Sequence, residues 1–316
     1  MTSESIGAQR RPRTTAEAVQ RSLQGGRVDI SGLLFQGALL LTLLVSLGIL
    51  ATLLIDVFIR AFPVLSSRGI DFLTSPLSSD PSRAGVSQGI VGSLMLMAFV
   101  VILALPTGIG AAIYLEEYAR DTRITRFLNT TVRNLAGVPA IVYGLLGLAT
   151  FVVFLRDVTG GRSVLAGALT LAVLVLPIVI ITTAEALRAV PTSIREAGYG
   201  VGATKWEVVR HHVLPYAAPG IFTGTILSLS RAFGETAPLI LVGAVLGGFS
   251  VVGGGSVVEQ LQGPYTALPT IVFNWARQPD TDFRALTAAA IVVLLAVMLL
   301  VNTTAILLRN RYDRRW

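Results

Sequence analysis

Long uninterrupted apolar runs are the feature that most restricts what this chain can fold into. Several of them reach the roughly 20 residues that an α-helix needs to cross a hydrocarbon core of about 30 Å. Backbone N–H and C=O groups in lipid must be satisfied within the segment, so such runs fold as spanning helices. The 316 residues are 53% hydrophobic and only 14% charged. This excludes an ordinary soluble domain, in which about 25% of residues are charged.

Six spanning helices are predicted, so we expect an all-α integral membrane fold. The apolar periods place the spans at residues 33–59, 87–115, 132–155, 165–184, 217–246 and 285–308. Four prolines lie inside them, and each removes a backbone donor that a neighbouring helix or water must replace: Pro106, Pro139, Pro177 and Pro219. Kinked helices suit a lined cavity better than a simple membrane anchor.

The basic residues predict the orientation of these spans. Most of the 25 Arg and Lys side chains precede span one or follow spans two, four and six. The positive-inside rule therefore places both termini and the loop at residues 186–216 in the cytoplasm. The net charge of +7 is attributed to these flanks and not to a nucleic-acid partner. Residues 1–32 lack the apolar core of a signal peptide and are predicted to be a disordered cytoplasmic tail before a single transmembrane domain at residues 33–316.

Two outer segments are long, residues 61–86 and 247–284. The second contains the run ALPTIVFNWA at residues 267–276, which is apolar but too short to span. We expect this run to be interfacial or re-entrant. Trp275 within it is expected to anchor the chain at the membrane interface, with substrate contact as the alternative.

The cytoplasmic loop between spans four and five has the pattern of a docking element. Residues 193–196 and 204–207 both have the S/T-x-x-E spacing of a capping box. Two short helices are therefore predicted, separated by a break around residues 200–202. Pro215 is expected to end the second of them and to begin the fifth span.

An apolar stripe on the second short helix needs a cover. Trp206, Val209 and Val213 are spaced as i, i+3 and i+7. They pack against the inner ends of this protein's own helices, which the spacing alone favours, or they enter a groove on a partner protein.

A charge pair lies in the fifth apolar run. Arg231 is near the middle of that run, and Glu235 follows four residues later on the same helix face. A central arginine costs about 2.5–3.5 kcal/mol on insertion scales, so it should face a cavity or a partner. The pair is either a structural ion pair or part of an anion pathway, in which the guanidinium binds phosphate oxygens and the carboxylate holds it when substrate is absent. Pro238 follows at once and is expected to loosen the helix.

Several other functions are disfavoured by the residues present. The sequence has no cysteine, and its two histidines, His211 and His212, would point about 100° apart on a helix, so we expect no metal site. It contains no G-x-x-x-x-G-K-[ST] loop for ATP. A secondary transporter would need a coupling-ion site and often repeated halves. A membrane-embedded enzyme would need paired carboxylates, a metal cluster or a nucleophile with its base.

The cytoplasmic loop resembles the EAA loop of ABC-importer permeases. The matching positions are Glu196, Ala197, Gly202, Leu214 and Pro215. Two positions depart from the pattern: Gly198 replaces the usual alanine, and His212 replaces the usual isoleucine.

Wider stretches resemble the permeases of the phosphate-specific ABC importer. They are residues 105–118, 134–144 and 231–239, and the resemblance extends from about residue 87 to the C-terminus. The run at residues 267–276 is more similar to the PstA type than to its PstC partner. A PstC-type permease of the same system, or a permease for another oxyanion, stays open as an alternative.

The resemblance implies a six-helix, MetI-like permease of a type I importer in the bacterial inner membrane. It implies that the loop from Glu196 to about His212, with Trp206 on its second helix, sits in a cleft of an ATPase subunit. It links Arg231 and Glu235 with phosphate passage. The implied partners are a PstC-type permease, two PstB-type ATPases and a PstS-type phosphate-binding protein. ATP and Mg would be bound by the ATPases, so this chain would hold no cofactor and catalyse no reaction itself.

Overall fold

A computed structural model describes residues 30–244 and 257–313, and every regular element within those ranges is helical. Contacts divide the chain into two compact units, Met1–Asp56 and Val57–Trp316. The first unit contributes the beginning of helix α2 (Ile30–Thr74). Residues 30–32, at the end of the predicted tail, belong to this helix. The rest of that tail lies outside the described residues.

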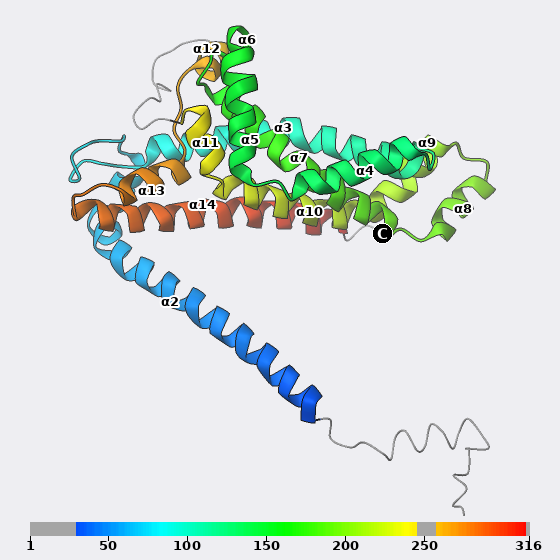
Figure 1. The fold of residues 1–316 in the computed structure, drawn as a ribbon, viewed down its shortest axis with the longest axis horizontal. Helices are drawn as coiled ribbons and strands as arrows, with labels where there is room; N and C mark the ends of the chain where they lie inside the picture. The colour runs from blue at the N-terminus through cyan, green and yellow to red at the C-terminus, as the bar shows by residue number, and fades with distance from the viewer. Residues whose placement is uncertain (1–29, 245–256, 314–316) are drawn as a thin grey trace, which may run out of the picture. The chain divides into compact units, whose positions relative to one another are not determined.

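The second unit contains the end of α2 and a bundle of helices (Figure 1). Three short segments, labelled η, are π-helical. In chain order the elements are α3 (Ser87–Ile113), η1 (Tyr114–Tyr118), α4 (Arg123–Ala136), α5 (Ala140–Gly147), η2 (Leu148–Phe154), α6 (Arg156–Thr159), α7 (Val164–Arg188), α8 (Thr192–Gly200), α9 (Lys205–Val208), η3 (Val209–Val213), α10 (Leu214–Gly234), α11 (Ala237–Val242), α12 (Val257–Gln262), α13 (Leu268–Ala276) and α14 (Asp282–Asp313).

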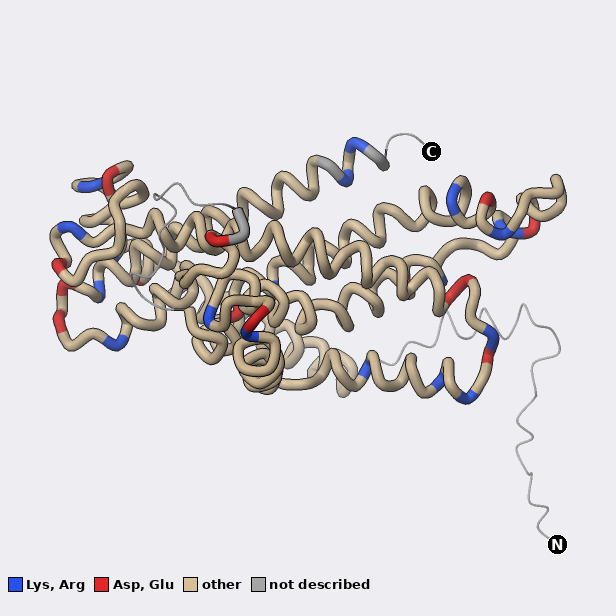
Figure 2. Tube along the Cα trace, turned by 90° about the horizontal axis from the view of Figure 1, so that it is seen from above, with Lys and Arg blue, Asp and Glu red and all other residues tan. Residues whose placement is uncertain are grey.

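The described helices support the predicted membrane class. Five of them are long and apolar enough to cross a membrane, and a sixth span results when α4 and the α5–η2 segment are counted as one bent span. The predicted starts at residues 87 and 165 agree with α3 and α7 to within one residue. Charged residues are sparse along these helices and gather near their ends (Figure 2), as expected when lipid surrounds the middle.

The third predicted span, residues 132–155, is sharply bent at its predicted proline interruption, Pro139. The chain bends by 102° between α4 and the α5–η2 segment. Pro139 explains the bend, because proline disfavours helical backbone in the residue before it and cannot donate a hydrogen bond itself. The helix before the bend begins earlier than predicted, at Arg123, where the Thr122 side chain accepts a hydrogen bond from the Thr125 N–H at 3.2 Å.

The fifth predicted span, residues 217–246, is also interrupted. Helix α10 ends at Gly234, Glu235 has an extended backbone, and α11 begins at Ala237. Pro238 lies in the first turn of α11, where its missing N–H costs nothing, but it would clash with the carbonyl of Gly234 in a continuous helix. Helix α11 then ends at Gly243, whose φ is +101°. The last predicted residues, 245–246, lie outside the described residues.

Helix α7 forms the centre of the second unit. Its most extensive contacts are with α3 and α10, and it also packs against α4 and α5. Small residues allow the close approach: a Cβ on Gly108 of α3 would lie 2.7 Å from the Val179 side chain of α7. Such small-residue contacts are typical of helix packing in membranes, where van der Waals contact replaces the hydrophobic effect as the driving force.

The short helix α13 buries most of its side chains against other helices. It packs against α14 and α3, and the Ser93 side chain accepts a hydrogen bond from the Leu268 N–H at 2.8 Å. Trp275 is only 2% exposed and its ring centroid lies 6.4 Å from that of Phe72 and 5.8 Å from that of Phe283. The interface anchor predicted at Trp275 was therefore wrong, because the indole is enclosed by other aromatic side chains. The run is too short to span, as predicted.

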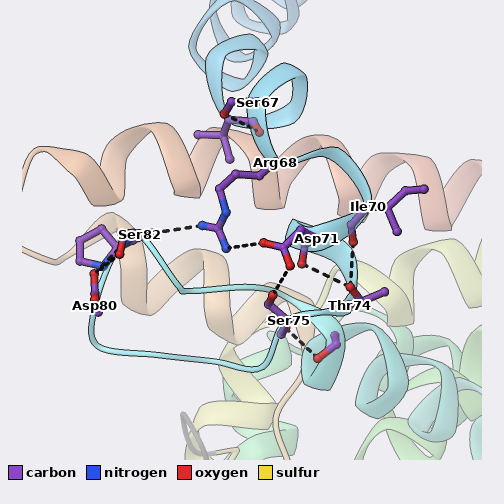
Figure 3. Close-up of polar contacts among 11 residues, drawn as sticks. Ser67, Arg68, Ile70, Asp71, Thr74, Ser75, Asp80 and Ser82 are labelled. Atoms are coloured by element: carbon purple, nitrogen blue, oxygen red, sulfur yellow. Dashed lines mark hydrogen bonds and ion pairs between the residues drawn. The ribbon is translucent and has the colours of Figure 1, made fainter.

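The segment between α2 and α3 is held by polar contacts (Figure 3). Arg68 donates to the Pro81 carbonyl at 3.2 Å and pairs with Asp71 at 3.7 Å. The Asp80 carboxylate accepts from the backbone and the side chain of Ser82, at 2.9 and 2.7 Å. These contacts fold residues 75–86 back along the end of α2 and direct the chain into α3.

Candidate functional site

The first helix of the predicted docking loop is α8. It begins at Thr192 after Pro191 and has no side-chain cap. The predicted capping box at residues 193–196 was therefore wrong, because Ser193 lies inside the first turn and not ahead of it. The helix ends in a Schellman motif: the Gly202 N–H donates to the Tyr199 carbonyl at 3.0 Å, and the Ala203 N–H donates to the Gly198 carbonyl at 3.2 Å.

Gly202 makes this helix end possible. Its φ is +84°, a left-handed conformation that glycine adopts without steric cost. A Cβ at this position would meet nothing within 4 Å. The requirement for glycine in the predicted break therefore comes from the backbone conformation and not from lack of space.

The second capping box is confirmed. The Thr204 N–H donates to the Glu207 carboxylate at 2.7 Å, and the Glu207 N–H donates to the Thr204 hydroxyl at 3.4 Å. The helix that follows runs through α9, η3 and α10 without a break, from Lys205 to Gly234. The prediction that Pro215 ends one helix and begins another was wrong. The π-turn ahead of Pro215, in which the Leu214 N–H donates to the Val209 carbonyl, accommodates the proline within one helix.

The predicted apolar stripe is divided between two surroundings. Val209 and Val213 are fully buried, together with Val208, and Val208 and Val213 pack against the end of α7. Trp206 is 53% exposed. The π-turn adds a residue to the turn and so shifts the buried face, which the regular 3.6-residue period could not predict. Packing within the chain thus accounts for the valines and leaves the indole uncovered by the described residues.

Most of the loop positions that match the EAA pattern are exposed. Glu196, Ala197 and Gly202 are exposed. Leu214 and Pro215 are half-buried, and Leu214 packs against the same cluster as Val213. Two large apolar side chains are exposed beside them, at Tyr199 and Val201.

The two departures from the EAA pattern have different consequences. A Cβ on Gly198 would lie 2.7 Å from the Val208 side chain, so glycine lets α8 lie close to α9. His212 is exposed, and its imidazole therefore displaces no apolar contact among the described residues.

Three cations of the loop region converge on the π-turn η1, a cluster that the sequence reasoning missed. Arg188 donates to the Glu116 carboxylate, with its Nε 2.8 Å from Oε2. Arg195 pairs with Glu117 at 2.7 Å. The Lys205 ammonium lies 5.2 Å from the centroid of the Tyr118 ring. The adjacent acids in the run YLEEY, at the end of the second span and on the side predicted to be cytoplasmic, were the available signal.

The predicted charge pair is present in the structure. The Arg231 Nε lies 3.4 Å from the Glu235 Oε1, and the side chains are 49% and 19% exposed. The pair lies at the break between α10 and α11, so the expected position of Arg231 in the middle of a continuous helix was wrong. Next to it, Ser230 donates to the Asn302 side chain of α14 at 2.8 Å. A half-exposed guanidinium at a helix end keeps donors free to bind an anion.

The loop and the charge pair are two separate sites. Figure 1 shows α8 and α9 at one end of the bundle, away from α11. Within the described residues there is no group of three or more His, Cys, Asp or Glu side chains that could hold a metal ion.

The fold and these sites define a class, a multi-pass helical membrane protein that carries an exposed two-helix loop and an ion pair at a helix break. Residues 104–316 match the family of binding-protein-dependent transport system inner membrane components. The chain belongs to this family and is a membrane permease component, a non-catalytic type of subunit.

Relatives of known sequence support the assignment. The chain is 33% identical over 267 residues to the phosphate transport system permease protein PstA of Yersinia pestis, a match that covers 81% of this chain and 85% of that protein. It is 31% identical over 199 residues to the probable ABC transporter permease protein YqgI of Bacillus subtilis, which covers 61% of this chain and 66% of that protein.

A solved structure has the same fold. The chain is similar to a chain of the bacterial alginate ABC transporter in complex with an alginate pentasaccharide-bound periplasmic protein. The TM-score is 0.60 at 15% identity, and the match covers 95% of this chain and 97% of that chain.

Proposed function

We propose that this chain is the PstA-type permease subunit of an ATP-driven phosphate importer. The phosphate transport permease of Yersinia pestis is similar over most of both chains, which supports the substrate class. The exposed face formed by Glu196, Tyr199, Val201 and Trp206 is the observation that carries the coupling role. Its two helices are held at a fixed angle by the Gly202 helix end and the Thr204 capping box.

The proposed assembly contains a second, PstC-type permease, two PstB-type ATPases and a PstS-type phosphate-binding protein. The ATPases bind ATP and Mg, and this chain binds no cofactor. The complex lies in the bacterial inner membrane with both termini of this chain and the loop in the cytoplasm, which the distribution of basic residues supports. Closure of the ATPases displaces the loop and switches the cavity between inward- and outward-facing states.

Arg231 is proposed to contact phosphate during passage. Its planar guanidinium offers paired donors that match phosphate oxygens. Glu235 holds the guanidinium when no anion is present, and the 3.4 Å separation is long enough for an anion to compete for the same donors. The glutamate would otherwise repel a passing anion, so the ion pair also lowers its effective negative charge.

The coupling role is tested by replacing the exposed indole. Trp206→Ala removes the largest apolar side chain of the exposed face, so we expect less ATPase to co-purify with the permease and uptake of labelled phosphate to fall in parallel. Phe154→Ala is the matched control, because Phe154 is also exposed, at 82%, but belongs to η2 and not to the loop. Equal retention of the ATPase by both variants would contradict the docking role.

The substrate is tested with the reconstituted complex. We expect ATP-dependent uptake of phosphate into vesicles, with competition by arsenate stronger than by sulfate or molybdate. Preferred uptake of another oxyanion would contradict the phosphate assignment while leaving the permease class intact.

A further inference from the structure

Arg195 is the most enclosed cation of the docking loop. It belongs to α8, one residue before the exposed Glu196, but its side chain turns inward and is 21% exposed, against 6% for its partner Glu117. Its Nη2 lies 2.7 Å from the Glu117 Oε1, and its Nε lies 3.3 Å from the same oxygen. The docking helix is therefore joined directly to η1, the continuation of α3.

The same guanidinium also reaches the end of α7. Its Nη1 donates to the Val190 carbonyl at 2.8 Å, and its Nη2 donates to the Leu187 carbonyl at 2.9 Å. The last carbonyls of a helix have no partner within that helix, so they accept such donors readily. One planar side chain thus connects three elements: α8, η1 and the C-terminal end of α7.

The chemistry of this contact is specific for arginine. Guanidinium presents five N–H donors in a rigid fork, and here three nitrogens are used on a carboxylate and two carbonyls. A lysine ammonium has three donors at one point and cannot reach all three acceptors in the same way. Because α3 and α7 form the most extensive helix contact of the protein, the fork connects α8 to its central pair of helices.

We propose that Arg195 and Glu117 are positioning residues that transmit displacement of the docking helix α8 to α3 and α7. The inference rests on the proposed coupling function of the loop and adds the route by which movement leaves it. The neighbouring pair Arg188–Glu116 provides a natural contrast. Its arginine is 46% exposed, and it joins α7 to η1 without involving α8.

The proposal is tested in the complete complex, reconstituted in vesicles, by measuring phosphate transported per ATP hydrolysed. We expect Arg195→Ala and Glu117→Gln to keep the ATPase bound and hydrolysing but to lower this ratio by about tenfold, within the range of coupling between linked sites. Arg195→Lys should give an intermediate ratio. Arg188→Ala, the matched control, should stay within about twofold of the unaltered protein, because Arg188 joins α7 to η1 without contacting α8.

Exchanging the two charges distinguishes a connection of α8 to both η1 and α7 through Arg195 from a simple attraction between opposite charges. The double variant Glu117→Arg with Arg195→Glu restores opposite charges, but a glutamate at position 195 cannot donate to the Leu187 and Val190 carbonyls. We therefore expect the transport ratio to remain low. Full recovery in the exchanged protein would overturn the proposed connection to α7, and an unchanged ratio in Arg195→Ala would overturn the proposal as a whole.

A second readout is independent of the transported substrate. The chain has no cysteine, so cysteines introduced at Ser193 on α8 and Tyr114 on η1, which are both exposed and lie outside the proposed docking face, can carry spin labels. In the unaltered background ATP binding should move both labels relative to a fixed label elsewhere in the complex. With Arg195→Ala we expect the label at position 193 to move and the label at 114 to remain still.

The two possible failures are distinguishable. In one failure, the complex binds ATPase and ATP binding moves both labels, but no phosphate is transported. This result would contradict the proposed substrate and would not contradict transmission through Arg195 and Glu117. Loss of ATPase binding in both Arg195→Lys and Glu117→Gln would show that the Arg195–Glu117 contact is needed for folding of the loop and does not act by transmitting movement. Movement of both labels in Arg195→Ala would overturn the proposal.

Discussion

Gly202 illustrates how one backbone angle shapes the proposed docking face. The residue stands at the left-handed position of a Schellman motif, with φ of +84°, and so sets the direction in which the chain leaves α8. Gly202→Ala should destabilise this helix end by about 1 kcal/mol, because a side chain raises the cost of positive φ. We expect weaker co-purification of the ATPase, and a still weaker complex for Gly202→Arg.

Gly200→Ala is the control for that prediction. Gly200 is in the last turn of the same helix, and a Cβ added there would also meet nothing within 4 Å, but its φ is not positive. Alanine there should be neutral or slightly stabilising. Equal losses in the two variants would mean that any side chain on this face obstructs docking, which would contradict the backbone explanation.

Arg231 leads to a prediction about transport alone. Arg231→Ala should abolish uptake of labelled phosphate while leaving the amount of permease and its ATPase binding unchanged, because the side chain is half exposed and supports little packing. Glu235→Gln keeps the shape of the carboxylate and removes its charge, so we expect a smaller change in uptake. Uptake at the normal rate in Arg231→Ala would contradict the anion pathway.

At the scale of elements, the segment between α2 and α3 should respond to acid. Hydrogen bonds from the Ser82 side chain and backbone lower the pKa of Asp80 from its ordinary 3.8. A lowered pKa in the folded state adds stability that is fully present above pH 3.8 and is lost as the pH falls through the lower folded value. We expect hydrogen exchange at residues 78–86, corrected for its intrinsic pH dependence, to rise only below about pH 4.

Asp80→Asn isolates this effect from general acid unfolding. The amide retains an acceptor oxygen but no charge, so residues 78–86 should exchange faster at neutral pH and show no further step near pH 4. Exchange that is unchanged at neutral pH would contradict a role for the carboxylate in holding the segment.

Element boundaries could be predicted where composition changes sharply and not where a span is interrupted. The start of α3 at Ser87 follows a polar segment and was predicted correctly. The breaks near Pro139 and Glu235 lie inside apolar runs, where hydropathy carries no signal and only proline indicates a possible bend. The spacing left open whether Trp206, Val209 and Val213 pack within the chain or against a partner. The structure divides them, with the valines buried and Trp206 exposed, because a π-turn that leaves no recognisable pattern in the side chains changes the helical phase.

At the scale of the whole molecule, helix packing depends on glycines that face other helices. A Cβ on Gly224 of α10 would overlap the Thr182 side chain of α7. Gly224→Ala should therefore push the helices apart and cost about 1–3 kcal/mol, as overpacking commonly does. We expect a lower midpoint in thermal unfolding in detergent and a smaller yield of folded protein.

The control lies on a different helix. A Cβ added at Gly110 of α3 would meet nothing within 4 Å, so Gly110→Ala should be neutral or should stabilise the helix by up to about 1 kcal/mol. A similar loss in both variants would show that helix–helix contact at Gly224 is not the cause.

The class of the molecule followed from composition, since a chain that is 53% hydrophobic with span-length runs has few other folds available. The exposure of the loop at Glu196 and Gly202 and the pairing of Arg231 with Glu235 were also predicted, but the helix break beside that pair was not. The cluster on η1 was not, because Glu116 and Arg188 or Glu117 and Arg195 are more than 70 residues apart. Only the folded arrangement of α3, α7 and α8 brings those charges together.

The unbroken helix from Lys205 to Gly234 has one further consequence, which is mechanical. It approaches α7 closely at Gly224, and this contact can serve as a fulcrum. At about 1.5 Å per residue, the arm toward Trp206 is about 27 Å long and the arm toward Arg231 about 10 Å. A sideways displacement of the Trp206 end would therefore move Arg231 in the opposite direction, by about two fifths of that displacement.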